Sequence, residues 1–260
     1  MLVYPQLGTG ALSQFPIRKQ RRMRTVVNTA SDGSSIKLAD PAGETTAWQL
    51  AYAGLTDGEI AALEQFFASA EGSLNGFTFV DPTANLLAWS GQLGNSAWAR
   101  GPALSVTGGI ADPAGGALAW RLTNQGAAAQ TISQTLAAPG AYVYCLSAYA
   151  RAATAGTVTM FVGANRADRT ITTQWSRIVF TASGNASAAS IGFGLEMPAG
   201  AVVDVFGIQA EAQAGASTYK SSTASGVYEN ARLLDDELKV TSNDVNSHSC
   251  TVNIIHVNDL

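Results

Sequence analysis

The alternation of apolar and polar residues predicts strands along most of this chain. Before residue 55, strand patterns occupy Arg24–Asn28, Ser35–Ala39 and Thr45–Ala53. Turn-forming residues separate them at 31–34 and 40–43, where a β-meander needs them. A further strand is expected at Gly76–Val80, before a turn at Asp81–Pro82. The first eighty residues therefore predict an antiparallel sheet.

One segment has the periodicity of a helix instead. Thr56 and Glu59 have the spacing of a capping box, which stabilises the start of a helix. The apolar residues that follow recur on one helical face, and Gly72 provides a stop. That face comprises Ile60, Leu63, Phe66 and Phe67. The sequence predicts a single α-helix over about 56–71.

From residue 85 to 226 the pattern indicates strands only, separated by clusters of small and turn-forming residues. This spacing is typical of an antiparallel sandwich or jelly roll. The expected strands are Leu86–Ser90, Ala117–Thr123, Gln130–Leu136, Tyr142–Ala150, Thr157–Gly163, Thr170–Thr173, Ser176–Ala182, Ser190–Glu196 and Val202–Ala210. Two more strands, Leu233–Val240 and Ser249–Val257, are expected around a polar turn at 242–246.

Charge separates this middle region from the two ends. Residues 1–84 and 227–260 together hold 8 Lys/Arg and 14 Asp/Glu, against 7 and 5 in residues 85–226. The C-terminal piece is too short to bury a core of its own, so we expect it to complete the N-terminal one. The predicted fold class is mainly β. A discontinuous β-sandwich or split-barrel scaffold (1–84 and 227–260, with the helix) carries an inserted antiparallel jelly-roll sandwich (85–226).

Composition limits the function classes. The apolar share of 47% is that of a globular protein, and a net charge of −4 argues against general nucleic-acid binding. Cys145 and Cys250 lie in strand-like patterns, so buried free thiols are expected rather than a bridge. The N-terminus lacks the pattern of a signal peptide, so none is expected. The sequence contains no run of 18 uncharged apolar residues, so no transmembrane helix is expected either.

The run from Trp48 to Pro82 resembles a known family. Its order is a strand with Trp48, the helix start at Leu55–Glu59, paired Phe66–Phe67, and an aromatic strand ending at Asp81–Pro82. Residues 228–257 match a closing hairpin. This order resembles the distal tail and minor tail proteins at the tail tip of long-tailed bacteriophages.

That resemblance implies a structural virion protein. The expected assembly is a ring, usually of six copies, that joins the tail tube protein to the tail-tip hub or minor tail proteins. DNA would pass through the lumen without specific binding. The expected location is the phage tail tip, after assembly in the bacterial cytoplasm. Some relatives hold an iron–sulfur cluster through a set of cysteines, but this chain has only two, so no cofactor is expected.

A second resemblance covers residues 85–223. Asn85–Leu87 and the stretches at 95–98, 140–144, 174–177 and 207–219 have the order seen in carbohydrate-binding-like jelly rolls of phages. The resemblance implies contact with a host cell-surface polysaccharide. It is an argument from fold, so the site itself must carry the function.

The residues do not predict catalysis. His248 and His256 are eight positions apart, without metal-ligand spacing. Asp235–Asp236–Glu237 lies in a predicted strand, whose successive side chains point to opposite faces, so a paired acid and base is not expected. No nucleophile elbow is present. We therefore expect neither an enzyme nor a metal site.

Sugar binding needs aromatic platforms beside polar groups, because a pyranose has an apolar face and a rim of hydroxyls. Trp98 and Arg100 lie in a Gly/Asn-rich stretch and are the best candidates. Trp120 and Arg151 are further candidates.

A basic segment precedes the first strand and leads into it. It contains Arg18, Lys19, Arg21, Arg22 and Arg24. Three interpretations stay open: contacts between ring subunits, a solvated face, and contact with DNA phosphates. Contact between subunits is favoured, since a basic patch can meet the acidic Asp235, Asp236 and Glu237 of a neighbour in a head-to-tail ring.

These observations lead to one main hypothesis and two alternatives. The main one is a tail-ring subunit with a peripheral module that contacts glycans. The first alternative is a stand-alone carbohydrate-binding module or host-adhesion protein outside any ring. The second, a polysaccharide-degrading tailspike, is disfavoured because no paired carboxylates are found.

Overall fold

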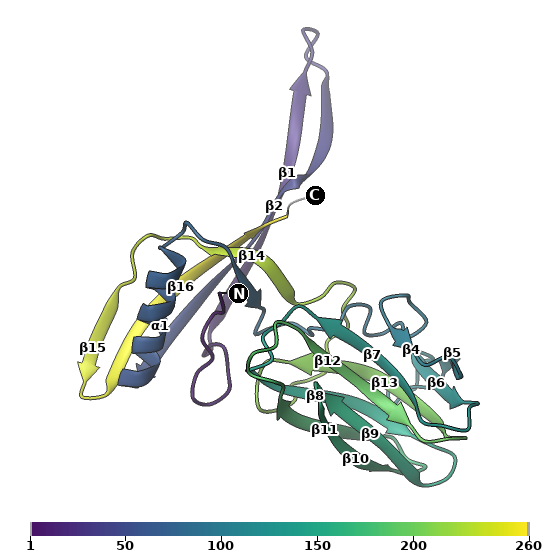
Figure 1. Ribbon diagram of the computed structural model, residues 1–260. Helices are drawn as coiled ribbons and strands as arrows, with labels where there is room; N and C mark the ends of the chain where they lie inside the picture. The colour runs from purple at the N-terminus through teal and green to yellow at the C-terminus, as the bar shows by residue number, and fades with distance from the viewer. Residues whose placement is uncertain (1, 259–260) are drawn as a thin grey trace. The chain divides into compact units, whose positions relative to one another are not determined.

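The computed structural model describes residues 2–258, which divide into two units (Figure 1). The first unit contains residues 2–5, 13–79 and 228–258, and the second contains residues 6–12 and 80–227. Nearly all elements are antiparallel strands, with one α-helix. The predicted fold class, mainly β with one helix and a sandwich, is confirmed.

In the first unit the strands form one sheet in the order β1-β2-β16-β14-β3, with β15 also paired to β16. β16 runs antiparallel to β2 from Val257 opposite Thr45 to His248 opposite Leu55. The expectation that the C-terminal residues complete the N-terminal sheet is therefore confirmed. The strand bounds are β1 Ile17–Thr29, β2 Ser35–Leu55, β3 Phe77–Val80, β14 Val227–Leu233, β15 Val240–Asp244 and β16 Ser247–Val257.

Helix α1 spans Asp57–Ala70 and begins as the capping box predicts. The Glu59 amide donates to Thr56 Oγ1 at 3.3 Å, and the Thr56 amide donates to Glu59 Oε2 at 2.9 Å. The helix ends where Glu71 and Gly72 adopt positive φ angles of 51° and 63°. Ile60, Leu63, Phe66 and Ala70 form its buried face.

Replacing Thr56 with alanine is expected to lower the free energy of unfolding by about 1 kcal/mol, because the Glu59 amide loses its acceptor. Urea unfolding followed by far-UV circular dichroism measures this change. A Thr56→Ser variant keeps the acceptor oxygen and is expected to stay close to the parent stability. Equal stability of all three proteins would contradict the assignment of the cap.

Aromatic rings fill the core between α1 and the sheet of the first unit. Tyr4 packs edge-on against Phe66 at 5.1 Å and Phe79 at 5.8 Å between ring centroids. Trp48 packs against Phe79 at 4.9 Å. The Tyr4 hydroxyl lies 2.7 Å from the Tyr52 hydroxyl, so two buried polar groups pair with each other. Burial raises the pKa of Tyr52 well above its usual value, which keeps that hydroxyl neutral.

The predicted turn at 40–43 is wrong. β2 continues through these residues as a strand of 21 residues, because a bulge absorbs them: Arg22 pairs with Thr45, whereas Arg24 already pairs with Asp40. A Cβ on Gly43 would lie 2.4 Å from the Arg24 side chain, so only glycine lets that arginine pack across the bulge. Pro41 lies within the bulge, where no ladder hydrogen bond is needed.

The second unit contains two five-stranded antiparallel sheets, in the orders β10-β9-β12-β7-β4 and β11-β8-β13-β6-β5. They pack as a sandwich around a buried apolar core (Figure 1). The strands are β4 Ala99–Arg100, β5 Leu104–Ile110, β6 Ala119–Asn124, β7 Gln130–Leu136, β8 Val143–Arg151, β9 Gly156–Val162, β10 Asn165–Ile171, β11 Ser176–Ser183, β12 Ile191–Met197 and β13 Val202–Glu211.

Two predicted strands are absent. Leu86–Ser90 forms turns, although Leu86 and Leu87 are buried, because its alternation serves packing without a partner strand. The strand predicted at Leu233–Val240 is interrupted: β14 ends at Leu233 and β15 begins at Val240. The polar residues between them form a loop. Conversely, β4 and β5 lie in a stretch that the pattern left without strands.

The chain enters and leaves the second unit at adjacent positions. The Asp81 amide donates to the Gly226 carbonyl at 2.8 Å. Residues 6–12, which the sequence placed in the scaffold, belong to the second unit instead. Gln6 explains this, because its side-chain amide donates to the Val143 carbonyl at 3.1 Å and accepts from the Val143 amide at 2.8 Å.

Cys145 and Cys250 are free and buried, as predicted. Burial raises the pKa of Cys250 to about 11, so its thiol stays protonated at neutral pH. Among the described residues, no helix is long and apolar enough to cross a bilayer.

Candidate functional site

Four partly exposed aromatic rings line a cavity of about 480 Å³ in the second unit. Trp120 comes from β6 and Phe206 from β13, whereas Trp89 and Tyr219 come from segments without regular structure. A cavity of this volume suits one or a few sugar rings. The remaining lining residues are small, polar or aliphatic: Gly91, Gln92, Gly109, Ala117, Leu118, Ser221, Ser222 and Thr223.

Trp120 is held in one orientation. Its indole Nε1 donates to the Gly91 carbonyl at 2.9 Å. A Cβ on Gly94 or Gly108 would lie 3.0 Å or 3.1 Å from the ring, so the indole packs directly on two glycine backbones. A ring fixed before binding loses little conformational entropy when a ligand stacks on it.

Tyr219 is fixed in a similar way. Its ring lies over Gly207, where a Cβ would come within 3.0 Å and where the backbone has a φ of 65°. Both features require glycine. The ring packs edge-on against Phe206 at 5.3 Å, and the hydroxyl lies 3.1 Å from Ser90 Oγ.

Trp89 adopts a φ of 49°, an uncommon conformation for a bulky residue that costs about 1–3 kcal/mol. Contacts on both sides of the residue maintain it. The Trp98 indole donates to the Trp89 carbonyl at 3.1 Å. Gln134 bonds both backbone groups of Ala88, at 3.0 Å and 2.6 Å. Strain of this kind is often stored at binding sites.

Hydroxyl and amide groups lie at the rim of this aromatic pocket. Gln92, Ser221 and Thr223 are exposed, and their side chains make no hydrogen bond with the described residues. Their polar groups are therefore available to a ligand. The pocket combines apolar ring faces with free donors and acceptors, which is the chemistry that a sugar requires.

The structure separates the four glycan candidates predicted from sequence. Trp120 lines the aromatic pocket. Trp98 is only 2% exposed and serves as a core residue, so it offers no ring face to a ligand. Arg100 is exposed on β4, and Arg151 lies on β8; neither lines the pocket. Sequence reasoning missed Phe206 and Tyr219, although Gly207 between them signals the close approach of a ring.

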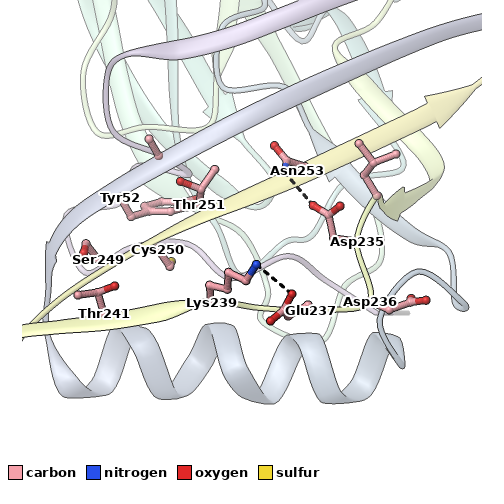
Figure 2. A pocket seen from close by; sticks show the side chains of 12 residues that line it. Tyr52, Asp235, Asp236, Glu237, Lys239, Thr241, Ser249, Cys250, Thr251 and Asn253 are labelled. Carbon is pink, nitrogen blue, oxygen red and sulfur yellow. Dashed lines mark hydrogen bonds and ion pairs between the residues drawn. The ribbon is translucent and has the colours of Figure 1, made fainter.

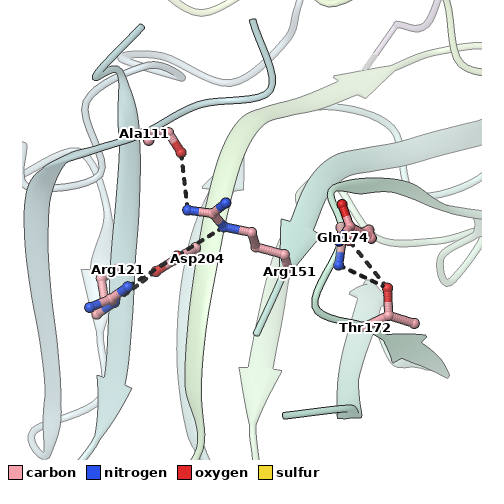
Figure 3. A network of polar contacts seen from close by, with 6 residues as sticks. All are labelled: Ala111, Arg121, Arg151, Thr172, Gln174 and Asp204. Carbon is pink, nitrogen blue, oxygen red and sulfur yellow. Dashed lines mark hydrogen bonds and ion pairs between the residues drawn. The ribbon is translucent and has the colours of Figure 1, made fainter. Parts of the chain in front are cut away.

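Arg151 belongs to a polar network on the β11-β8-β13-β6-β5 sheet (Figure 3). Asp204 accepts from Arg121 Nε at 2.8 Å and from Arg151 Nε at 3.2 Å. The bond from Arg121 to Asp204 raises the pKa of that guanidinium. Arg151 also donates to the Ala111 carbonyl at 3.4 Å, and its guanidinium lies 4.8 Å from the Trp175 ring centroid.

The basic residues predicted as subunit contacts all lie on β1, in the hairpin of β1 and β2. Lys19 lies 5.5 Å from the Trp48 ring centroid. The Arg18 guanidinium donates to the side-chain oxygen of Gln49 at 3.4 Å. Exposed ion pairs join Arg21 to Glu44 at 2.7 Å and Arg24 to Asp40 at 3.1 Å. Exposed pairs of this kind add little to the stability of the fold.

The hairpin also exposes apolar side chains. Ile36 is 65% exposed and Leu38 is 52% exposed on β2, and Met23 and Val27 are exposed on β1. The tip of the hairpin extends away from α1 within the first unit (Figure 1). A two-stranded ribbon with exposed apolar residues is marginally stable in water, and such a surface is typical of a protein interface.

The three carboxylates of the predicted acidic cluster each have a different partner. Asp235, Asp236 and Glu237 line a cavity of about 840 Å³ in the first unit, in the loop between β14 and β15 (Figure 2). Asp235 accepts from Asn253 at 2.8 Å. Asp236 accepts from Ser73 Oγ at 2.6 Å, a bond that lowers the pKa of this carboxyl. Glu237 forms an exposed ion pair at 3.1 Å with the lysine two positions on. Whether they contact a neighbouring subunit stays a prediction.

The described residues contain no group of three or more His, Cys, Asp or Glu side chains placed to hold a metal ion. His248 Nε2 lies 2.7 Å from Asp57 Oδ1, within hydrogen-bond distance, at the start of α1.

No protein-family profile matches the sequence, and no curated protein matches it. Solved structures with a similar β fold include the CBM22-1 xylan-binding domain of Paenibacillus barcinonensis Xyn10C, at 14% identity and a TM-score of 0.42, over 54% of this chain and all 100% of that one. TmCBM61 in complex with β-1,4-galactotriose matches at 17% identity and a TM-score of 0.35, over 49% of this chain and 98% of the other. The enzymatically active domain of bacteriophage CBA120 tailspike protein 4 matches at 15% identity and a TM-score of 0.38. The match covers 51% of this chain and 21% of the other. These similarities concern about half of the chain and are similarities of fold.

Proposed function

We propose that the second unit binds a glycan in the aromatic pocket. The observation that supports this proposal most is the convergence of Trp89, Trp120, Phe206 and Tyr219 on one cavity of 480 Å³ with free polar groups at its rim. Stacking on the rings would desolvate the apolar face of a sugar, while the rim groups replace the water on its hydroxyls. We therefore propose a binding protein and not an enzyme.

Binding of the full chain to immobilised polysaccharides tests this proposal. The array would carry neutral polysaccharides such as xylan and galactan, acidic ones such as polygalacturonate and alginate, and purified bacterial capsules. We expect saturable binding to at least one of them. Absence of binding across the array, with protein shown to be folded, would contradict the proposal.

The hairpin of β1 and β2 favours a second function, assembly. We propose that copies of the chain form a closed ring, in which the hairpin of one copy contacts the first unit of the next. Burial of each apolar side chain of the hairpin would contribute about 1.5–3 kcal/mol, which exceeds what exposed ion pairs provide. The cations on β1 would then orient the contact with an acidic surface of the neighbour.

Under this proposal the ring is a distal tail ring of a long-tailed phage. It would join the tail tube protein to the tail-tip hub or minor tail proteins in the virion, let DNA pass without specific binding, and present the second unit to the host surface. Native mass spectrometry tests the assembly. A ring predicts about six copies, whereas a stand-alone module predicts one copy.

A further inference from the structure

One face of the β11-β8-β13-β6-β5 sheet places arginine and aromatic side chains beside the aromatic pocket. Residues directly opposite each other in antiparallel strands share a face. Phe206 pairs with Tyr149, and Tyr149 pairs with Arg177, so these three side chains form a row across β13, β8 and β11. Phe206 also lines the pocket, so the row begins at the site already described.

A second row runs parallel to the first on the same face, two residues along each strand. It contains Arg121, Asp204 and Arg151 from β6, β13 and β8 (Figure 3). Two arginines of this face, one from each row, lie over aromatic rings. Arg151 lies 4.8 Å from the Trp175 ring centroid, and Arg177 lies 5.5 Å from that of Tyr149.

The two rows together form one surface, called the arginine face below. Cations dominate the part of it that is accessible to solvent. Its two carboxylates are buried and already bonded: Asp204 to Arg121 and Arg151, and Glu211 to Ser217 and Gln209. The side chain of Arg151 is 30% exposed and that of Arg121 is 47% exposed, against 7% for Asp204. The face therefore presents guanidinium groups to solvent and keeps its negative charge inside.

Two of these guanidinium groups retain unused donors. Arg151 uses Nε and Nη2 in its bonds to Asp204 and Ala111, and Arg177 uses Nη2 in its bond to Ser147. No contact within residues 2–258 uses Nη1 of either side chain. A carboxylate is the planar acceptor that suits such donors best.

We propose that the glycan is acidic, and that it extends from the aromatic pocket onto the arginine face. A neutral part of the sugar chain would stack in the pocket, while a sugar carboxylate, as in a uronic or sialic acid, would accept from Arg177 and Arg151. This inference rests on the proposed function of the pocket and adds the charge of the ligand to it.

Affinities of the full chain for carboxylated and neutral polysaccharides test the inference. The carboxylated probes are polygalacturonate, alginate, hyaluronan and polysialic acid, and the neutral ones are xylan and galactan. We expect at least one carboxylated probe to bind, and Arg177→Gln to weaken that binding about tenfold, the value of one charge-assisted hydrogen bond. Binding is also expected to weaken as salt rises, since the contact is ionic.

Arg166→Gln is the matched control. Arg166 also stacks on an aromatic ring, that of Phe161 at 5.0 Å, and pairs with Glu196, but it lies on β10 in the other sheet. We expect its loss to leave the affinity unchanged. Thermal unfolding of each variant verifies that the fold is retained.

Two outcomes would overturn the inference of an acidic glycan without contradicting the proposed function of the aromatic pocket. One is binding of neutral probes alone, with equal affinity for the parent and Arg177→Gln. The other is an equal loss of affinity in the Arg166→Gln and Arg177→Gln variants, together with binding of dextran sulfate as tight as that of any carboxylated probe. That result would indicate nonspecific electrostatic attraction. Binding of no probe at all would overturn the proposed function as well.

Discussion

Replacing Trp120 with alanine is expected to weaken glycan binding at least about 30-fold, because aromatic anchors of this kind contribute about 2 kcal/mol or more when truncated. The substitution removes one of the two indole rings of the aromatic pocket and the contact that this indole makes with Gly91. Isothermal titration calorimetry with the best ligand from the array measures the loss.

Two further variants make this result specific. Trp120→Phe keeps a ring on Gly94 and Gly108 and is expected to keep part of the affinity. Leu74→Ala removes an exposed aliphatic side chain from the first unit, outside the pocket, and is expected to leave the affinity unchanged. If Trp120→Ala bound as well as the parent protein while remaining folded, the pocket would not be the site.

The second large effect is expected on the hairpin. Introducing Ile36→Asp and Leu38→Asp together should convert the assembled protein to a monomer, because two buried carboxylates without partners would oppose the contact. Both side chains are more than half exposed in the single chain, so the fold itself should tolerate the change. Sedimentation velocity at several protein concentrations measures the assembly state.

A change of charge elsewhere serves as the control. Val245→Asp alters the turn between β15 and β16, where the valine is 91% exposed, and is expected to leave the assembly intact. A parent protein that stays monomeric at high concentration would contradict the assembly proposal, and so would a doubly substituted hairpin that still assembles.

Local signals in the sequence predicted local structure well. The Thr56 and Glu59 pair defines the start of α1 because a capping box depends on four consecutive residues. The pairing of β16 with β2 was also predictable, since the C-terminal segment alone lacks the size for a core. The turn expected at 40–43 failed for a local reason: whether a Pro–Gly stretch turns or bulges depends on its partner strand, here at Arg24.

The candidate site was much less predictable. Trp98 and Trp120 have similar neighbours in the sequence, yet the first is buried and the second lines the pocket. Exposure depends on which strands cover a residue, and the pocket is assembled from five separate segments between residues 89 and 223. Tyr219 lies beside Phe206 because Gly207 permits the tyrosine ring to approach the strand. Such a convergence follows from the topology and not from spacing along the chain.

The account depends most on the claim that a glycan binds against the rings of the aromatic pocket. The indole N–H signals of the five tryptophans in a ¹H–¹⁵N spectrum, recorded while the best ligand is added, test it directly. We predict that the signals of Trp89 and Trp120 shift, while that of Trp48, in the core of the first unit, does not. Saturable binding that leaves the Trp89 and Trp120 signals in place would contradict the claim.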